Sequence, residues 1–222
     1  MNAQAVRRAQ QAIREVGRPR PFRRGDILMM SGEPSTEVLL VESGAVKVVL
    51  LAPNGSESIV GILGPGELLG ELGVMSGRPR NATVVGHLDG VAWHVARDVF
   101  LRLLERDRDI SVLINNTLQD RLYHADNRQL AFAALDVPTR VAAQLLTWAR
   151  SHGEQVDGGL RVHGMTQRDL ALAVTASEKT VEAVLRDLRA AGLVRTSRRA
   201  YLLPDPVALE RLLRQHGWTP ES

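Results

Sequence analysis

Cysteine is absent from this chain of 222 residues, and that absence alone removes several kinds of chemistry. Without thiols the protein has no disulfide, no thiolate zinc site, no cysteine nucleophile and no cysteine-ligated iron–sulfur cluster. Long apolar runs are missing too, because no stretch approaches the roughly 18 uninterrupted apolar residues that a membrane span needs. Residues 1–14 contain arginines but no apolar core of a secretory signal. We therefore expect a cytoplasmic protein without a membrane partner.

Signatures of common enzymes are also lacking. The chain contains neither a Gly-x-Ser-x-Gly nucleophile motif nor a phosphate-binding P-loop. The spacing of its histidines does not match metal-ligand patterns such as His-Glu-x-x-His. These histidines are His87, His94, His124, His152, His163 and His216. The sequence therefore favours a protein that is not an enzyme and holds no metal ion.

What remains is the composition of an ordinary globular protein, with 44% hydrophobic and 24% charged residues. The length suits one large domain or two modest ones. The formal net charge of +3 is unevenly placed, because residues 160–222 contain ten Lys and Arg against seven Asp and Glu, whereas residues 1–159 contain eighteen of each. A positive surplus confined to the last third is a mild indication of a nucleic-acid partner.

The first hundred residues predict a short helix followed by an all-β domain. Val6, Ala9, Ile13 and Val16 recur at helical spacing, which predicts an amphipathic helix over residues 3–16. Aliphatic runs then alternate with Gly-, Pro-, Asn- and Asp-rich breaks about every ten residues, a pattern typical of a sandwich, barrel or jelly roll. The runs are Ile27–Met30, Val38–Val41, Ala45–Leu51, Ser58–Ile62, Ala82–Val85 and Val91–Val95.

Helical spacing returns at Arg97 and continues through a long segment. The helix predicted over residues 109–134 has no Gly or Pro inside it, and its stripe recurs about every 3.5 residues, as in a coiled-coil seam. The stripe contains Ile114, Leu118, Leu122 (or Arg121), Ala125, Gln129 and Phe132. This spacing favours a dimer interface, although a core-facing helix has a similar pattern. Pro138 breaks the pattern and predicts a hinge.

The last third predicts a winged helix-turn-helix. Two short helices are separated by a tight turn and followed by a basic two-stranded ribbon, and Thr166 begins a Thr-x-x-Asp capping pattern. The alternative is a helical hairpin used only for packing. The expected elements are Thr139–Ser151 (helix), Leu160–Val162 (strand), Gln167–Ala173 and Ser177–Ala190 (helices), Val194–Thr196 and Ala200–Leu203 (strands), and Pro206–Gln215 (helix).

The second helix of this motif leaves polar residues exposed at its start, at positions that enter the major groove. Lys can read guanine acceptors, Glu can accept from cytosine N4, and a Thr methyl can meet a thymine methyl. The arginines around the helix suit phosphates. We therefore predict DNA contacts from Thr166, Gln167, Arg168, Ser177, Glu178, Lys179, Thr180, Glu182, Arg186, Arg195, Arg198 and Arg199.

The segment from Gly70 to Val84 predicts an anion site. It begins with a small-residue turn and a helix-length stretch, then returns through Arg80 into a strand. Backbone amides at such a turn bind anions, and a guanidinium clamps a phosphate with a planar fork. The nearby Glu71 carboxylate only accepts hydrogen bonds, which suits a sugar hydroxyl. The alternative is a buried Glu–Arg pair without a ligand.

These motifs and their order resemble the CRP/FNR family of bacterial transcription regulators, most closely its cyclic-AMP receptor branch. Gly70-Glu71-Leu72 and Arg80-Asn81-Ala82 are similar to the family's nucleotide-pocket pattern, Asp136–Ala142 to its hinge, and Thr166–Leu185 in outline to its DNA-reading segment. The resemblance covers roughly residues 20–204. It implies an α+β chain with a cyclic-nucleotide-binding-like β jelly roll over 1–107, a dimerisation helix and hinge over 108–137, and a winged helix-turn-helix over 138–222.

The resemblance also implies partners and roles. They include a homodimer, a palindromic operator in double-stranded DNA, RNA polymerase, and cyclic AMP or cyclic GMP as allosteric ligand. Glu71 would bind the ribose hydroxyl and Arg80 the cyclic phosphate, while the long helix covers the base. The implied ligand-binding positions are Gly70, Glu71, Leu72, Gly73, Arg80, Asn81, Ala82, Ala125 and Asp126. Because the family also contains haem-based gas sensors, His87 or His94 as a haem ligand is an alternative.

The chain departs from the family pattern where the base would lie. Asn81 stands where cyclic-AMP receptors have Ser or Thr, and Ala125 and Asp126 stand where Thr followed by Ser or Asn usually meets adenine. Ala125 cannot hydrogen-bond the base, whereas ionised Asp126 can accept from the adenine amino group or from both guanine N1–H and its amino group. Cyclic GMP therefore competes with cyclic AMP. A degenerate pocket, with nucleotide-independent DNA binding or another small ligand, is the remaining alternative.

The DNA-reading helix departs from the pattern as well. Glu178 and Ala183 replace two arginines of typical members, and an arginine bound to guanine contributes about 1–3 kcal/mol of discrimination. We therefore expect an operator that differs from the usual cyclic-AMP-receptor site. Thr175 stands where the family often has Gly, and because a threonine at positive φ is strained, we expect that turn to be built differently.

Overall fold

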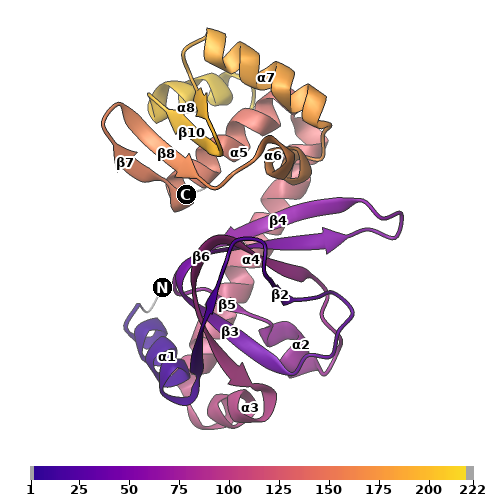
Figure 1. Ribbon diagram of the computed structural model, residues 1–222, viewed down its shortest axis with the longest axis vertical. Helices are drawn as coiled ribbons and strands as arrows, with labels where there is room; N and C mark the ends of the chain where they lie inside the picture. Colours follow the sequence, from indigo (N-terminus) through magenta and orange to yellow (C-terminus); the bar gives the residue numbers. More distant parts are fainter. Residues whose placement is uncertain (1–2, 219–222) are drawn as a thin grey trace. The chain divides into compact units, whose positions relative to one another are not determined.

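The computed structural model describes residues 3–218, so residues 1–2 and 219–222, at the outer ends of the expected first and last domains, lie outside the described range. The chain divides into two compact units, Met1–Ala125 and Asp126–Ser222, and one long helix, α4 (Arg108–Ala134), runs across the division. Antiparallel sheets combined with helices confirm the expected α+β class (Figure 1). Within residues 3–218, no helix is both long and apolar enough to cross a membrane.

The first unit is the expected β roll, with helices packed on one face of its six-stranded antiparallel sheet. The strand order is β1-β6-β3-β4, with β2 paired to β6 and β5 paired to β3. The strands are β1 (Arg18–Phe22), β2 (Ile27–Met29), β3 (Glu37–Leu51), β4 (Glu57–Leu63), β5 (Leu68–Leu69) and β6 (Thr83–Ala96). The helices are α1 (Ala3–Val16), α2 (Glu71–Ser76), α3 (Arg97–Arg106) and the first part of α4.

Two long strands replace four of the expected short ones. The sequence predicts breaks at Ser43-Gly44 and Asp89-Gly90, but β3 and β6 run through both sites and pair with each other, with register shifts nearby. A Cβ atom on Gly44 would lie 2.4 Å from the Asp89 carbonyl oxygen, and one on Gly90 would lie 2.0 Å from the Ser43 carbonyl oxygen. These glycines therefore allow two strands to approach closely at a bulge and do not mark turns.

Three further strands escape prediction from the sequence. β1 contains Pro19 and Pro21, which cannot donate to a neighbouring strand, but it lies at the edge of the sheet, where proline is tolerated. β5 is only two residues long, and β7 (Glu154–Val156) lies in a Gly-rich segment that predicts a loop. Short edge elements thus depend on the neighbouring strand more than on their own residues.

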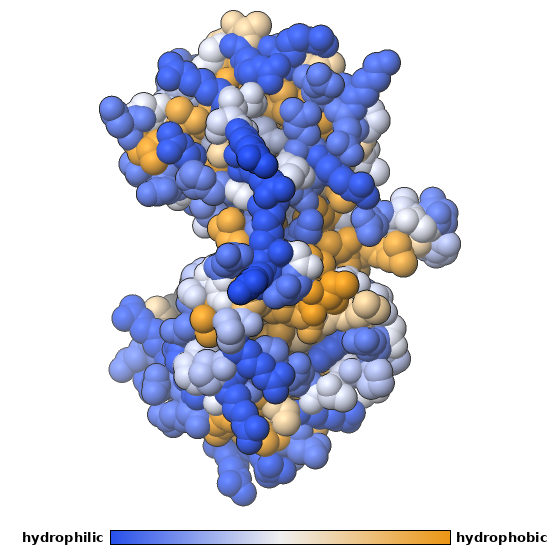
Figure 2. Space-filling view, in the orientation of Figure 1, coloured by the Kyte–Doolittle hydropathy of each residue, from blue (hydrophilic) through white to orange (hydrophobic). Residues whose placement is uncertain are grey.

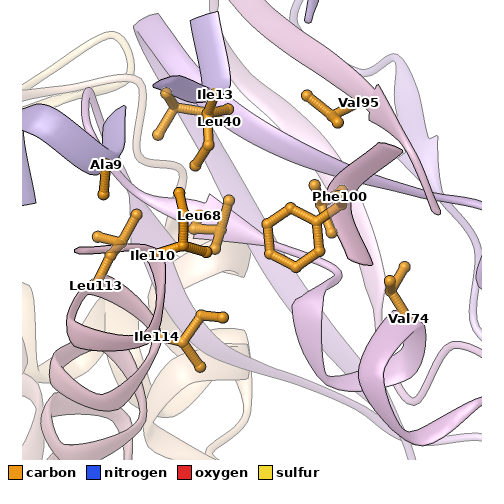
Figure 3. Close-up of a cluster of buried hydrophobic side chains, with 11 residues drawn as sticks. Ala9, Ile13, Leu40, Leu68, Val74, Val95, Phe100, Ile110, Leu113 and Ile114 are labelled. Atoms are coloured by element: carbon orange, nitrogen blue, oxygen red, sulfur yellow. The ribbon is translucent and has the colours of Figure 1, made fainter. Parts of the chain in front are cut away.

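The helices of the first unit pack on the roll through one apolar cluster (Figure 3). Ile13 of α1, Phe100 of α3 and Ile110 of α4 meet Leu40 and Leu68 of the sheet, and all five side chains are fully buried. Full burial of one such side chain contributes about 1.5–3 kcal/mol. The cluster therefore anchors the first turns of α4 to the roll, so Ile114 and Leu118, which the helical spacing predicts in the dimer seam, pack on the roll instead.

The second unit is the expected winged helix-turn-helix, with a four-stranded antiparallel sheet in the order β7-β8-β10-β9. Its elements are α5 (Val137–His152), β7, β8 (Gly159–His163), α6 (Gln167–Val174), α7 (Glu178–Ala190), β9 (Arg195–Ser197), β10 (Ala200–Leu203) and α8 (Pro206–Gln215). The break between α4 and α5 lies at Leu135-Asp136 and not at Pro138. Asp136 caps α5 by accepting from Thr139 N at 2.9 Å, so Pro138 lies in the first helical turn, where a missing N–H costs little.

Candidate functional site

Glu71, at the start of α2, is a carboxylate buried completely within the first unit. It follows Gly70, whose φ is +82° and where a Cβ atom would lie 2.4 Å from Arg80 Nη1. Glycine is therefore required at this turn, both for the backbone angle and for the close approach of the guanidinium. Burial raises the pKa of the Glu71 carboxyl, and the positive charges of Arg121 and Arg80 oppose that rise.

One oxygen of Glu71 is bound by an arginine from α4. Arg121 Nη1 donates to Glu71 Oε1 at 2.6 Å, and Arg121 Nη2 donates to the Leu68 carbonyl oxygen. The helical spacing offers Arg121 as an alternative to Leu122 in the predicted dimer seam, and this prediction is wrong because Arg121 faces the roll. Leu122 is 64% exposed in the single chain. The only sequence signal for Arg121 is a cation beside an apolar stripe, because its partner lies 50 residues away.

The other oxygen, Glu71 Oε2, is buried and has no hydrogen-bond partner within residues 3–218. Burial removes the hydration of this oxygen, and an unsatisfied acceptor of this kind is costly. A hydroxyl or amine hydrogen delivered by a ligand would satisfy it. The carboxylate is thus held by Arg121 on one side and is ready to accept on the other.

Arg80 is fixed beside this carboxylate by two backbone carbonyls. Its Nη1 donates to Gly70 O at 2.9 Å, and its Nη2 donates to Glu37 O. The residue is 8% exposed, and burial lowers the pKa of its guanidinium, with Glu37, Glu71 and Glu33 opposing the change. Arginine nevertheless stays charged, so the site presents a fixed cation with N–H groups left over for an anion.

The structure brings Gly70, Glu71 and Arg80 together and leaves other expected ligand positions at the surface. Asn81, Leu72, Ala125 and Asp126 are exposed, whereas Ala82 and Gly73 are half-buried. At Gly73 a Cβ atom would lie 2.0 Å from Ser35 Oγ, so α2 packs directly on that hydroxyl.

The two histidines considered for haem lie on β6. His87 is buried, and His94 Nδ1 lies 3.1 Å from Glu37 Oε2. Within residues 3–218, no three His, Asp or Glu side chains are grouped to hold a metal ion.

The second unit presents the expected reading helix. Thr166 and Asp169 form a reciprocal capping box at α6, with both N–H···O distances 3.0 Å. Ser177 caps α7 by accepting from Thr180 N at 3.0 Å. Val181, Val184, Leu185 and Leu188 form the buried face of α7, as the sequence predicts.

The start of α6, the opposite side of α7 and the wing carry the polar residues proposed to meet DNA. Those that are exposed are Arg168, Ser177, Glu178, Lys179, Thr180, Glu182, Arg186, Arg195, Arg198 and Arg199, whereas Thr166 and Gln167 are half-buried. The turn between β9 and β10 consists of two adjacent arginines, Arg198 and Arg199, and Arg199 has φ +58°. Hydrophilic residues dominate the visible surface of this unit (Figure 2).

The turn between α6 and α7 places Thr175 in the left-handed conformation that a glycine would adopt there. The expectation that threonine would force a different turn is therefore wrong. Thr175 has φ 52° and ψ 58°, and its N–H donates to Ala171 O. A β-branched residue in this left-handed region is strained. We expect Thr175→Gly to raise the free energy of unfolding by about 1 kcal/mol, because relief of strain exceeds the entropy that glycine adds to the unfolded chain.

Urea denaturation of the full chain tests this effect of Thr175. The control is Thr175→Ala, which removes the branched side chain but keeps a Cβ atom, and it should recover only part of the gain. A lower midpoint for Thr175→Gly than for the unsubstituted protein would show that the turn is not strained.

Comparison with known proteins matches both units. Residues 19–107 match the family model of the cyclic nucleotide-binding domain, and residues 139–212 match that of the Crp-like helix-turn-helix domain. The chain is 34% identical over 197 residues to the CRP-like cAMP-activated global transcriptional regulator of Mycobacterium tuberculosis, and the match covers 88% of each protein.

Solved structures share the fold at lower identity. The c-di-GMP responsive global regulator CLP of Xanthomonas campestris has a TM-score of 0.79 at 20% identity, over 89% of this chain and 98% of that one. FixK2 from Bradyrhizobium japonicum has a TM-score of 0.77 at 23% identity, over 89% and 97%. At this level of identity the likeness concerns the fold alone.

Proposed function

The chain belongs to the CRP/FNR family of bacterial transcription regulators, and from this premise we propose that a cyclic nucleotide bound in the β roll controls its binding to DNA as a homodimer. The observation that carries the ligand half is Glu71 Oε2, a buried oxygen without a donor, next to the fixed guanidinium of Arg80. A cyclic nucleotide brings one hydroxyl donor and one anionic phosphate on the same sugar. The hydroxyl would donate to Glu71 Oε2, and the phosphate would accept from the remaining N–H groups of Arg80.

In this proposal each pocket residue has one task. Glu71 Oε2 accepts from the ribose hydroxyl while Arg121 keeps Oε1, and Arg80 donates its remaining N–H groups to the cyclic phosphate. The turns around them supply backbone amides. These come from Gly70, Leu72, Gly73, Asn81 and Ala82.

The apolar side chains that α4 exposes support a dimer through this helix. Leu122 and Leu130 are each 64% exposed, and Phe132 is exposed as well. A second copy of the helix would cover Leu122 and Leu130, whereas Phe132 lies beneath the guanidinium of Arg140. We assign residues 1–107 to the sensor, 108–137 to the dimer helix and hinge, and 138–222 to DNA binding.

Control of transcription then requires that the ligand bind one dimer arrangement better than another. A ligand shifts a conformational equilibrium only by its difference in affinity for the two states. The favoured state would place two α7 helices in major grooves one helical turn apart on a palindromic site, from which the regulator would contact RNA polymerase in the cytoplasm.

Calorimetric titration with cyclic AMP, cyclic GMP and cyclic di-GMP, followed by DNA binding with and without each, tests this function. The M. tuberculosis relative is named for activation by cAMP, which favours cyclic AMP. We expect one cyclic mononucleotide to bind and to change DNA affinity. If none of the three binds while DNA binding persists, the pocket is degenerate and the regulator acts without nucleotide.

The substitution Asp126→Ala should change the affinities for cyclic GMP and cyclic AMP to different extents. An ionised Asp126 accepts from two guanine donors but from only one adenine donor, so its loss should weaken cyclic GMP about tenfold or more and cyclic AMP less. Calorimetry measures both affinities. Asp120→Ala, which removes an exposed carboxylate from the same helix, is the control, and an equal loss for both nucleotides in Asp126→Ala would contradict a role in reading guanine.

A further inference from the structure

The exposed side of α7 is acidic over its first two turns, which is unusual for a helix that approaches a polyanion. Glu178 and Glu182 lie one turn apart, and both are exposed. No side-chain hydrogen bond or ion pair engages either carboxylate within the part of the chain that the structure describes. The two carboxylates repel each other and the DNA phosphates, whereas the position of Glu178 in the first turn favours the helix itself. A base contact in the bound state would offset the repulsion from the phosphates.

The neighbouring residues leave these carboxylates as the main groups able to read bases. Thr180 Oγ1 lies 2.7 Å from Ser177 Oγ, so the threonine hydroxyl is part of the helix cap. Ala183 has no polar side-chain atom. Lys179 is the one cation of the first two turns, because the next one on α7 is Arg186. Besides the Thr180 methyl group, the exposed side chains of the first two turns of α7 therefore offer bases two carboxylate acceptors and one ammonium donor.

A carboxylate requires a base edge that donates. In the major groove the donors are cytosine N4 and adenine N6, whereas guanine and thymine present acceptors. Adenine places its acceptor N7 beside N6, and that nitrogen repels a carboxylate. Cytosine has no acceptor beside N4 on the same base. Glutamate at both positions thus selects cytosine over the other three bases.

We propose that α7 reads cytosine, with Glu178 and Glu182 each accepting from the N4 amino group of one cytosine in every half-site. Lys179 donates to a guanine in the same half-site. Four helical residues advance about 6 Å and a base-pair step advances about 3.4 Å, so the two cytosines lie about two steps apart. This inference rests on the proposed function, since it requires that α7 enter DNA at all.

Selection from a random double-stranded DNA library tests the inference. The full-length protein is used with and without cyclic AMP or cyclic GMP, and the selection is repeated with Glu178→Gln and Glu182→Gln. Glutamine binds adenine N6 and N7 together, so each variant should change one selected position from cytosine to adenine, with a shift of about tenfold or more in relative affinity. Asp187→Asn, which removes one exposed carboxylate later on α7, should leave the selected bases unchanged.

Three outcomes are decisive. A change from cytosine to adenine at separate positions in the two glutamine variants supports the inference. Variants that bind all sequences more tightly and equally, with the base preference unchanged, overturn it, because the carboxylates then act only through charge. If the unsubstituted protein retains no DNA and enriches no sequence, the proposed DNA-binding function itself fails, and the inference fails with it.

Discussion

Arg80→Ala is expected to abolish cyclic-nucleotide binding, with a loss of affinity of at least about 100-fold, because each charge-assisted hydrogen bond contributes about 1.5–3 kcal/mol and a guanidinium makes two to a phosphate. The Gly70 and Glu37 carbonyl oxygens already orient the side chain, so the ligand does not have to immobilise it. Calorimetric titration with cyclic AMP and cyclic GMP measures the effect. Unchanged affinity would show that the nucleotide does not bind at Arg80, and the proposed pocket would then be wrong.

Loss of Arg80 also removes two bonds that hold the roll together, so the stability of the variant has to be measured beside its affinity. Arg80→Lys keeps the charge but not the planar fork, and it should bind more weakly than the unsubstituted protein while folding normally. Arg78→Ala is the matched control, because Arg78 is an exposed arginine two positions away. We expect Arg78→Ala to leave nucleotide affinity unchanged. Equal losses in Arg78→Ala and Arg80→Ala would indicate a general effect of charge.

The elements that the sequence predicts well are those whose pattern is local. The capping box of α6, the cap of α7 and the buried stripe of α7 depend on residues three or four positions apart, and the structure confirms all three. The continuous course of β3 and β6 is not local. Gly44 and Gly90 look like turn residues until the opposite strand is known, because only the pairing shows whose backbone occupies the missing side-chain space.

The residues of the candidate pocket show the same difference between local and non-local patterns. Gly70, Glu71 and Arg80 lie within eleven consecutive residues, so a short motif brings them into view together. Arg121 joins them from another element, across 50 residues, and along its own helix it resembles part of a surface seam. One helix here contributes a residue to the pocket and also exposes apolar residues. The spacing along the sequence alone does not show which residues belong to the pocket and which to the apolar stripe.

Arg140→Ala is expected to lower the free energy of unfolding by about 2–4 kcal/mol, because it leaves two carbonyls at helix ends without their charged donor. Arg140 Nη1 donates to Leu135 O at 2.7 Å, just beyond α4, and Arg140 Nε donates to Val174 O at 3.3 Å, at the end of α6. Its guanidinium carbon also lies 5.3 Å from the centre of the Phe132 ring, which adds about 0.5–1 kcal/mol. Urea denaturation of the full chain measures the change.

Arg140→Ala should lower the affinity for DNA by more than its loss of stability explains. The reason is that Val174 immediately precedes the strained turn at Thr175 that orients α7. At a temperature where Arg140→Ala remains folded, we expect its affinity for a selected operator to fall about tenfold. Arg150→Ala is the control on the same helix, since Arg150 is exposed and its partner Glu210 would keep Arg214 as a second partner. Arg140→Lys, which keeps the charge but cannot reach both carbonyls, should be intermediate. If Arg140→Ala matches Arg150→Ala in both measurements, the guanidinium does not couple the end of the dimer helix to the turn before the reading helix.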